Sequence, residues 1–162
     1  MTMQTTETSD TSVRTSIVVE APLERAFSVF TDAIGTWWPP EHHIFTGELA
    51  EMVFEPRAGG RLYDRGVDGT ECCWARVLVY ERPDRFVISW DISLQWQIEP
   101  DPARASEIEV RFVPESPTRT RVELEHRHLD RHGEGWEQMR DAVGSPDGWG
   151  RGMERFAERV QA

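Results

Sequence analysis

Apolar side chains occupy every second position of the chain between residues 86 and 98. These residues are Phe86, Ile88, Trp90, Ile92, Leu94, Trp96 and Ile98, and mostly polar residues separate them. Successive side chains of a strand point to opposite faces, so this spacing predicts one long strand with a face that is apolar throughout. The chain is therefore expected to build its core on a sheet.

The segments on both sides of this strand also show a period of two. Turn signals such as Asp68-Gly69 and Arg82-Pro83-Asp84 separate them, as in antiparallel hairpins. The predicted strands are VRTSIVVE (13–20), EMVFEP, GRLYDRG, CCWARVLVYE, SEIEVRFVPE (106–115) and TRTRVELEHRHL (118–129). Together they predict a curved antiparallel sheet of about six or seven strands.

Helical patterns lie near the two ends of the chain. Pro22 suits the first turn of a helix that continues as LERAFSVFTDAI, and a short second turn ends near Gly35. Ser145 and Pro146 suit the N-cap and first position of a final helix. The apolar face of that helix carries Trp149, Met153, Phe156 and Val160. This order of elements lets the sheet close around the C-terminal helix.

Three glycines interrupt or flank the final helix, where each costs roughly 1 kcal/mol against alanine. They are Gly148, Gly150 and Gly152. Either close packing against the sheet or room for a ligand would explain them, and packing is the more usual explanation.

Length and composition limit the partners and the location of the chain. Its 162 residues suit one domain, with a disordered tail expected at residues 1–12 and a single domain at 13–162. Acidic residues outnumber basic ones by 29 to 18, and a net charge of -11 disfavours nucleic acids and anionic membranes as partners. No signal peptide or membrane span is apparent, and the adjacent Cys72 and Cys73 offer no disulfide framework. A cytoplasmic location is expected.

Several motifs resemble the START/Bet v 1-like helix-grip superfamily (SRPBCC) from about residue 13 to the end. They are SIVVEAPLERAF, GGRLYDRG, DGTECCWARVLVYERPDRFVISW, TRVELEH and GWGRGMERF. Within that superfamily they are most similar to the branch named after the C-terminal domain of the activator of Hsp90 ATPase. The resemblance implies an α+β fold with two short helices after the first strand and a long C-terminal helix. It also implies a deep apolar cavity for lipids, polyketides or other hydrophobic molecules.

Strand parity and the final helix indicate which residues would line that cavity, together with two tryptophans that precede the prolines. The predicted ligand-binding residues are Trp37, Trp38, Phe86, Ile88, Trp90, Phe112, Leu124, His126, Trp149, Met153 and Phe156. For any one of them, packing in the core is the more ordinary explanation. As a group, seven tryptophans in 162 residues favour an entrance ringed by aromatic side chains.

Two polar residues are predicted to share the inward face. Asp64 turns inward if Arg61 and Arg65 face solvent, and His126 continues the side of Leu124. A carboxylate and an imidazole in an apolar pocket could serve as an acid/base pair. A satisfied buried hydrogen bond is the alternative, and we prefer it because nothing in the sequence brings the two together.

The stretch TWWPPEHHIFTG (36–47) concentrates tryptophan, proline and histidine. Its two prolines exclude regular helix or central strand. His42 and His43 are adjacent and lack the spacing of a metal site, so we expect no metal and no cofactor, and interpret them as residues of a gate or rim. No phosphate-binding glycine loop and no GxSxG motif is present, which excludes those nucleotide-binding and serine-hydrolase classes.

The sequence thus predicts a non-catalytic binder of a small, mostly apolar molecule. A cyclase or hydrolase that uses Asp64 and His126 is the first alternative, and whether the chain is an enzyme stays open. An interaction module that binds a chaperone is the second alternative. The identity of the ligand and the formation of a homodimer also stay open.

Overall fold

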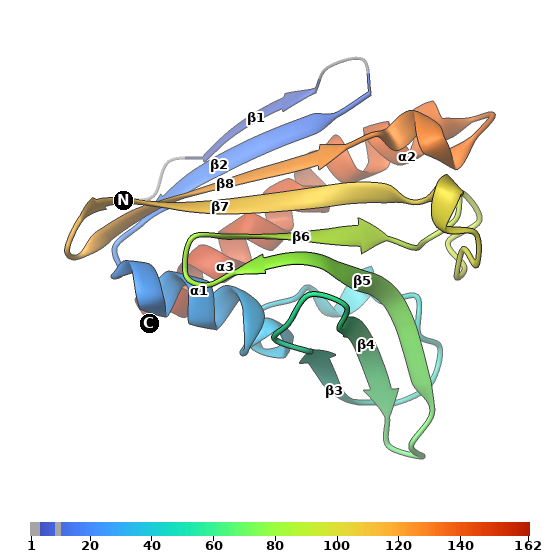
Figure 1. Cartoon of the computed structure of the whole chain (residues 1–162), viewed down its shortest axis with the longest axis horizontal. Coiled ribbons are helices and arrows are strands. Elements are labelled where there is room, and N and C mark those ends of the chain that lie inside the picture. Colours follow the sequence, from blue (N-terminus) through green and yellow to red (C-terminus); the bar gives the residue numbers. More distant parts are fainter. Residues whose placement is uncertain (1–3, 9–10) are drawn as a thin grey trace.

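A curved antiparallel sheet forms the body of the molecule (Figure 1). The computed structural model describes residues 4–8 and 11–162. In this part of the chain, eight strands pair in the order β1-β2-β8-β7-β6-β5-β4-β3. They are β1 (Gln4–Thr8), β2 (Val13–Val19), β3 (Leu49–Phe54), β4 (Arg61–Gly66), β5 (Glu71–Glu81), β6 (Arg85–Trp90), β7 (Ser106–Ser116) and β8 (Arg119–Arg127).

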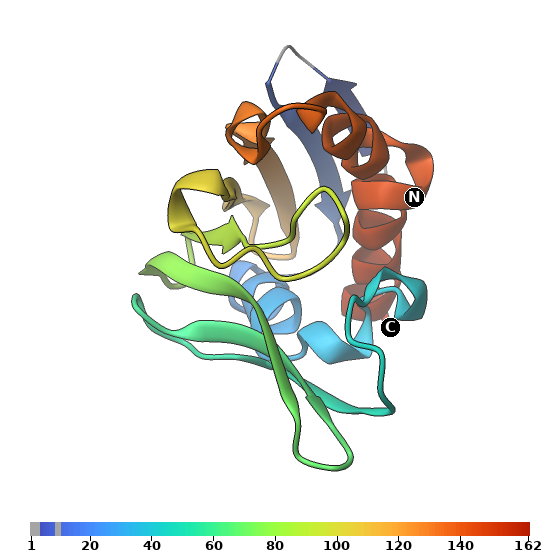
Figure 2. The ribbon, with the colours of Figure 1, turned by 90° about the vertical axis from the view of Figure 1, so that its right-hand side faces the viewer.

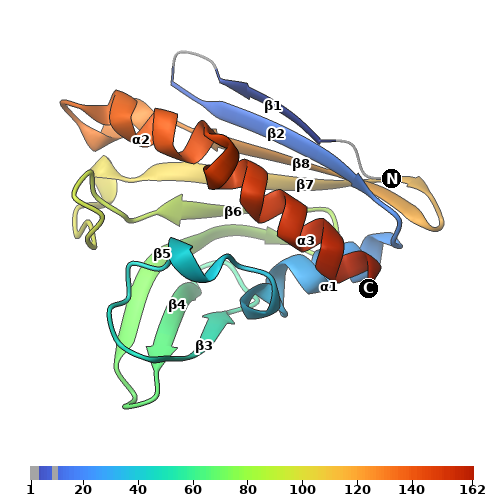
Figure 3. The same ribbon diagram turned by 180° about the vertical axis from the view of Figure 1, so that it is seen from behind.

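Three α-helices accompany the sheet among the described residues: α1 (Leu23–Thr31), α2 (Trp136–Gly144) and α3 (Arg151–Gln161). Short helical turns lie at Ile34–Thr36, Pro40–His42, Pro102–Arg104, Leu129–His132 and Pro146–Gly150. Figure 3 shows α2 and α3 running one after the other across one face of the sheet, with α1 beside the C-terminal end of α3. The predicted helix-grip fold is confirmed, with slightly more strands than predicted. None of the described helices is long and apolar enough to cross a membrane.

Strand β1 lies in the segment that was predicted to be a disordered tail. It pairs with β2 in antiparallel register, with Gln4 opposite Ile17. The Oγ1 atoms of Thr6 and Thr15 are 2.9 Å apart, which makes a cross-strand hydrogen bond. The β-branched threonines of this segment favour a strand, whereas its low hydrophobicity suggested a disordered tail. The rest of the first ten residues, 1–3 and 9–10, lies outside the described part.

Strand β6 is shorter than the strand predicted for residues 86–98. After Trp90 the chain folds back on itself, and the Ser93 N–H donates to the Gln97 carbonyl at 2.7 Å. This turn holds Trp96 at a φ of 59° and leaves its side chain 46% exposed. Alternation alone does not distinguish one long strand from a strand followed by a narrow loop. The prediction was therefore wrong beyond residue 90.

The C-terminal helical region bends between α2 and α3. Gly148, in this bend, has φ -87° and ψ -122°, which are not helical values. A Cβ atom there would lie 2.4 Å from the Val143 carbonyl oxygen, so the bend requires glycine. At Gly152 an added Cβ would meet side chains at 3.8 Å or more, which is ordinary contact. Close approach of the backbone therefore explains Gly148 but not Gly152.

Phenylalanine rings fill the space between α1, α3 and the sheet. Phe27 and Phe30 are three residues apart, so both reach inward from one face of α1. Phe30 contacts the rings of Phe86, Phe112 and Phe156 at centroid distances of 5.6, 5.7 and 4.9 Å. All five rings are almost fully buried. This end of the grip is a packed core.

Candidate functional site

A cavity of about 590 Å³ lies where the bend between α2 and α3 faces the sheet. Residues from the WWPP loop (residues 37–45), the end of β6, the turn at Trp96 and the α2–α3 bend line it. Figure 2 shows these segments around one end of the molecule, with the WWPP loop in cyan and the loop after β6 in yellow-green. The volume lies within the range of roughly 300–1,000 Å³ that is usual for ligand pockets.

Four indole side chains form a tryptophan wall in this cavity: Trp38, Trp90, Trp96 and Trp149. The ring centroid of Trp149 lies 5.7 Å from that of Trp38 and 6.0 Å from that of Trp90. The Trp38 indole N–H donates to the carbonyl of His42 at 3.3 Å. Trp149 thus packs against both Trp38 and Trp90, and the wall offers a largely apolar surface.

The predicted ligand-binding residues divide between this wall and the core beneath it. Three of them, Trp38, Trp90 and Trp149, line the cavity. The others are buried in the core and are not among its lining residues; they are Trp37, Phe86, Ile88, Phe112, Leu124, His126, Met153 and Phe156. Strand parity thus identified the inward face correctly, but it did not identify the open end of that face. Direct ligand contacts of any of these residues stay a prediction.

His126 is fully buried behind the tryptophan wall. Its Nδ1 accepts a hydrogen bond from the Trp149 indole at 3.1 Å, and its Nε2 lies 2.8 Å from the hydroxyl of Ser106. The same hydroxyl lies 2.8 Å from Nε2 of His132. Burial, with a smaller contribution from the nearby His132, lowers the pKa of His126 to about 3. His126 is therefore a neutral structural residue at ordinary pH.

Asp64 has different partners from His126. Its Oδ2 lies 2.8 Å from Nδ1 of His43, and its Oδ1 accepts a hydrogen bond from the Trp74 indole at 3.4 Å. Asp64 is 1% exposed, so its carboxylate is shielded from solvent and contacts His43 and Trp74 instead. The structure does not bring Asp64 and His126 together as the predicted acid/base pair, and buried hydrogen bonds, the preferred alternative, account for both. The sequence did not indicate that His43 would contact Asp64. His43 lies in an irregular loop and Asp64 in a strand, so strand parity says nothing about the direction of the His43 side chain.

The WWPP loop is fixed to both the sheet and the helix. His43 attaches it to β4 through Asp64, and Glu41 forms an ion pair with Arg151 at the start of α3. The carbonyl of Trp37 accepts a hydrogen bond from Arg155 Nε at 2.8 Å. The loop therefore forms one fixed wall of the cavity, between the sheet and α3.

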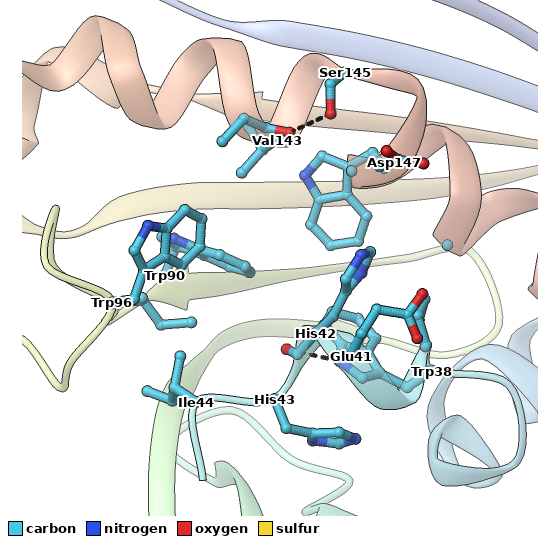
Figure 4. A pocket seen from close by; sticks show the side chains of 16 residues that line it. Trp38, Glu41, His42, His43, Ile44, Trp90, Trp96, Val143, Ser145 and Asp147 are labelled. Atoms are coloured by element: carbon cyan, nitrogen blue, oxygen red, sulfur yellow. Dashed lines mark hydrogen bonds between the residues drawn. The ribbon is translucent and has the colours of Figure 1, made fainter. Parts of the chain in front are cut away.

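His42 and His43 lie on opposite sides of this loop. Figure 4 shows the His42 ring projecting into the cavity toward Asp147, whereas the His43 ring points away from it. Burial lowers the pKa of His42 below its usual 6.5. The carboxylate of Glu41 and the backbone of Asp147 act in the opposite direction and favour the protonated ring. His42 is a half-buried imidazole at the cavity, and the gate or rim role of His42 and His43 stays a prediction.

No group of three or more His, Cys, Asp or Glu side chains is placed to hold a metal ion within the described residues. Burial raises the pKa values of the Cys72 and Cys73 thiols. Protonated thiols are weak nucleophiles and metal ligands. The titratable side chains that line the cavity are those of Glu41, His42, His43 and Asp147.

Known proteins resemble this chain along most of its length. Residues 20–161 match the family described as activator of Hsp90 ATPase homolog 1-like protein. An anthrahydroquino-gamma-pyrone synthase, Txn09, solved in complex with SUM, is 45% identical; the match covers 92% of this chain and 96% of that one, with a TM-score of 0.65. No curated protein matches the chain.

Two further solved structures are similar. The self-sacrificing resistance protein CalC from Micromonospora echinospora is 29% identical, with 93% of this chain and 94% of that one covered and a TM-score of 0.64. Protein NE0264 from Nitrosomonas europaea is 14% identical, with the same two coverages and a TM-score of 0.66. At 14% identity the likeness concerns the fold alone.

Proposed function

We propose that this chain, which belongs to the family of activator of Hsp90 ATPase homolog 1-like proteins, binds a small, mostly hydrophobic molecule. The proposal rests on one observation, the tryptophan wall around a cavity of about 590 Å³. Burial of apolar ligand surface there would supply about 25 cal/mol per Å². Flat indole surfaces suit a ligand with aromatic or polyketide-like rings.

The comparisons support a small-ligand-binding domain of the helix-grip type. The match to the family and the helix-grip neighbours agree with the superfamily that the sequence motifs indicated. Txn09, 45% identical to this chain, is described as a synthase in a complex with SUM, a description that suits a domain with a small-molecule site. The ligand of this chain and its physiological role are the proposed part.

Occupation of the cavity can be tested directly. Native mass spectrometry of the purified protein, followed by extraction with organic solvent, would give the mass of a bound molecule. In parallel, tryptophan fluorescence is titrated with N-phenyl-1-naphthylamine and a panel of polycyclic phenols. We expect quenching or a spectral shift, because the probes would stack against the wall. If extraction yields no bound molecule and no compound of the panel changes the tryptophan fluorescence, the proposal is wrong.

An enzymatic function is the second candidate, favoured by the 45% identity with a protein described as a synthase. The pair first predicted for it, Asp64 and His126, is not assembled, because each residue has other partners. Incubation with polyketide-like substrates and analysis by mass spectrometry separates the two functions. A binder returns each molecule unchanged, whereas an enzyme changes its mass or its retention time.

The other expectations from the sequence stay predictions. A chaperone partner, a homodimer and a cytoplasmic location each need their own measurement. A pull-down with Hsp90 and sedimentation at several concentrations would test the first two. The helix-grip cavity is the feature that favours a small ligand over a protein partner.

A further inference from the structure

The cavity has one polar side in an otherwise mostly apolar wall. His42 projects from the WWPP loop into the cavity. Asp147 lies on the opposite side of the cavity, in the bend between α2 and α3 (Figure 4). Glu41 lies beside His42 on the same loop. A ligand that fills the cavity would therefore place one of its edges against His42.

Most other polar groups of the wall are already used inside the protein. The Trp149 indole donates to His126 at 3.1 Å, and the Ser145 hydroxyl donates to the Ala142 carbonyl at 2.8 Å. Glu41 is paired with Arg151. His42, whose ring projects into the cavity beside the backbone of Asp147, is therefore the imidazole of the wall that can exchange a proton with a ligand.

A second group in the wall also indicates a polar atom on the ligand. Trp90 is 6% exposed, and its indole N–H is buried without a hydrogen-bond partner in the part of the chain that the structure describes. Buried donors normally have partners, so this one is an exception that needs an explanation. An oxygen atom of a bound ligand is the partner that the cavity could supply.

The charges around His42 suit a ring that is neutral at rest and becomes charged on reaction. Burial is the largest influence and lowers the pKa of the ring. Glu41 and Asp147 raise that pKa, and Arg151 lowers it. On the remaining side of the loop, His43 is engaged with Asp64 at 2.8 Å. Two carboxylates are thus placed to stabilise an imidazolium that forms within the cavity.

We propose that His42 accepts the proton of an acidic hydroxyl, a phenol or an enol, on a ligand held against the tryptophan wall. The ligand O–H bond breaks, its electron pair stays on oxygen, and the proton forms an N–H bond on the imidazole. A phenolate or enolate and an imidazolium result, with no change in total charge. The step rests on the proposed ligand-binding function and supplies what an enzyme would need, a nucleophilic oxygen or carbon on the ligand.

4-Nitrophenol is a suitable probe because its phenolate absorbs visible light and the neutral phenol does not. It is mixed with excess protein about one pH unit below its own pKa, where about a tenth is ionised. With the wild-type protein we expect the phenolate band of the bound probe to grow about fivefold, which corresponds to an ionisation constant about tenfold larger. In His42→Gln the band should shrink on binding, because an apolar cavity favours the neutral phenol.

A matched control removes an imidazole elsewhere. His128 is exposed and has a φ of 59°, which asparagine tolerates, so His128→Asn should behave as the wild type. If the phenolate band shrinks in wild type and His42→Gln alike, while tryptophan fluorescence reports binding in both, the role of His42 is refuted and the binding function stands. If neither 4-nitrophenol nor the larger phenols change the fluorescence, the binding function fails, and this role fails with it.

Discussion

The two ends of the face enclosed by sheet and helix contain similar residues but differ in packing. At one end, Phe27 and Phe30 of α1 fill the space and meet Phe86, Phe112 and Phe156. At the other end, four tryptophans surround a cavity of about 590 Å³. Both ends are rich in aromatic rings, so composition does not decide which is filled. The filled end is the one that α1 reaches.

The bend before α3 contributes to the same difference. Gly148 lets the backbone come close to the end of α2, and the bend lines the cavity. The indoles that flank it are held by hydrogen bonds to His126 and to the carbonyl of His42. Large rings whose orientation is fixed do not collapse into free space. The cavity is thus a consequence of backbone geometry and locked side chains.

The largest effect is expected from truncation at the packed end. Phe156→Ala removes a ring with no exposed surface that contacts Phe30 and Trp37. The free energy of unfolding should fall by about 3–5 kcal/mol, measured by urea denaturation. Phe156→Leu should lose less, and its folded fraction should bind an aromatic probe as the wild type does. A loss below about 1 kcal/mol in Phe156→Ala would mean that this end is not a packed core.

Two glycine substitutions test the bend. In Gly148→Ala the new Cβ would meet the carbonyl oxygens of Val143 and Ala142 at 2.4 and 2.5 Å. The free energy of unfolding should fall by about 1–3 kcal/mol, and probe binding should weaken as the bend shifts. Gly152→Ala is the matched control, because its Cβ meets ordinary contacts and alanine favours the helix by up to about 1 kcal/mol. Equal effects of the two changes would contradict the role of the bend.

The buried His126 predicts a specific loss of stability in acid. The unfolded imidazole takes up a proton below pH 6.5, whereas the folded one stays neutral down to a pKa of about 3. The contribution of His126 to the free energy of unfolding is thus fully present above pH 6.5. Between pH 6.5 and about 3 it decreases by about 1.4 kcal/mol for each unit that the pH falls.

Substitution of this histidine should flatten that dependence. In His126→Asn the slope of unfolding free energy between pH 6 and 5 should be smaller by about 1.4 kcal/mol per unit. The matched His128→Asn should keep the wild-type slope, because this side chain is exposed. An unchanged slope in His126→Asn would show that the imidazole is already protonated in the folded protein.

Much of the fold could be predicted from local periodicity, because burial of one face leaves a direct trace in the sequence. The alternation that placed Phe86, Ile88 and Trp90 inward is of this kind. The limits of elements were harder to predict. Ser145, predicted as an N-cap, makes no capping bond and donates to the Ala142 carbonyl.

The site was less predictable than the fold, because it depends on contacts between distant segments. His43 and Asp64 are 21 residues apart, and nothing in either segment indicates the other. Likewise, parity gave Trp90 and Phe86 the same direction without indicating that only Trp90 borders the cavity. The missing information is the position of α1 and of the bend, which tertiary packing alone determines.

The smallest change in stability, and the sharpest contrast with Phe156, is expected at Trp96. This side chain lines the cavity yet is 46% exposed, in a turn where its φ of 59° is unfavourable for a bulky residue. Trp96→Ala should change the free energy of unfolding by no more than about 0.5 kcal/mol. Probe affinity should fall by about fivefold, since an indole in contact with an aromatic ligand contributes on the order of 1 kcal/mol.

Val67→Ala is the control for Trp96→Ala, because Val67 is 62% exposed and does not line the cavity. It should alter neither stability nor probe binding appreciably, as measured by urea denaturation and fluorescence titration. If Trp96→Ala lowers the free energy of unfolding as much as Phe156→Ala does, both ends are packed cores. The contrast between a filled end and an end with a cavity is then wrong. If it keeps both stability and affinity, the turn is not part of the binding surface, and the wall consists of Trp38, Trp90 and Trp149.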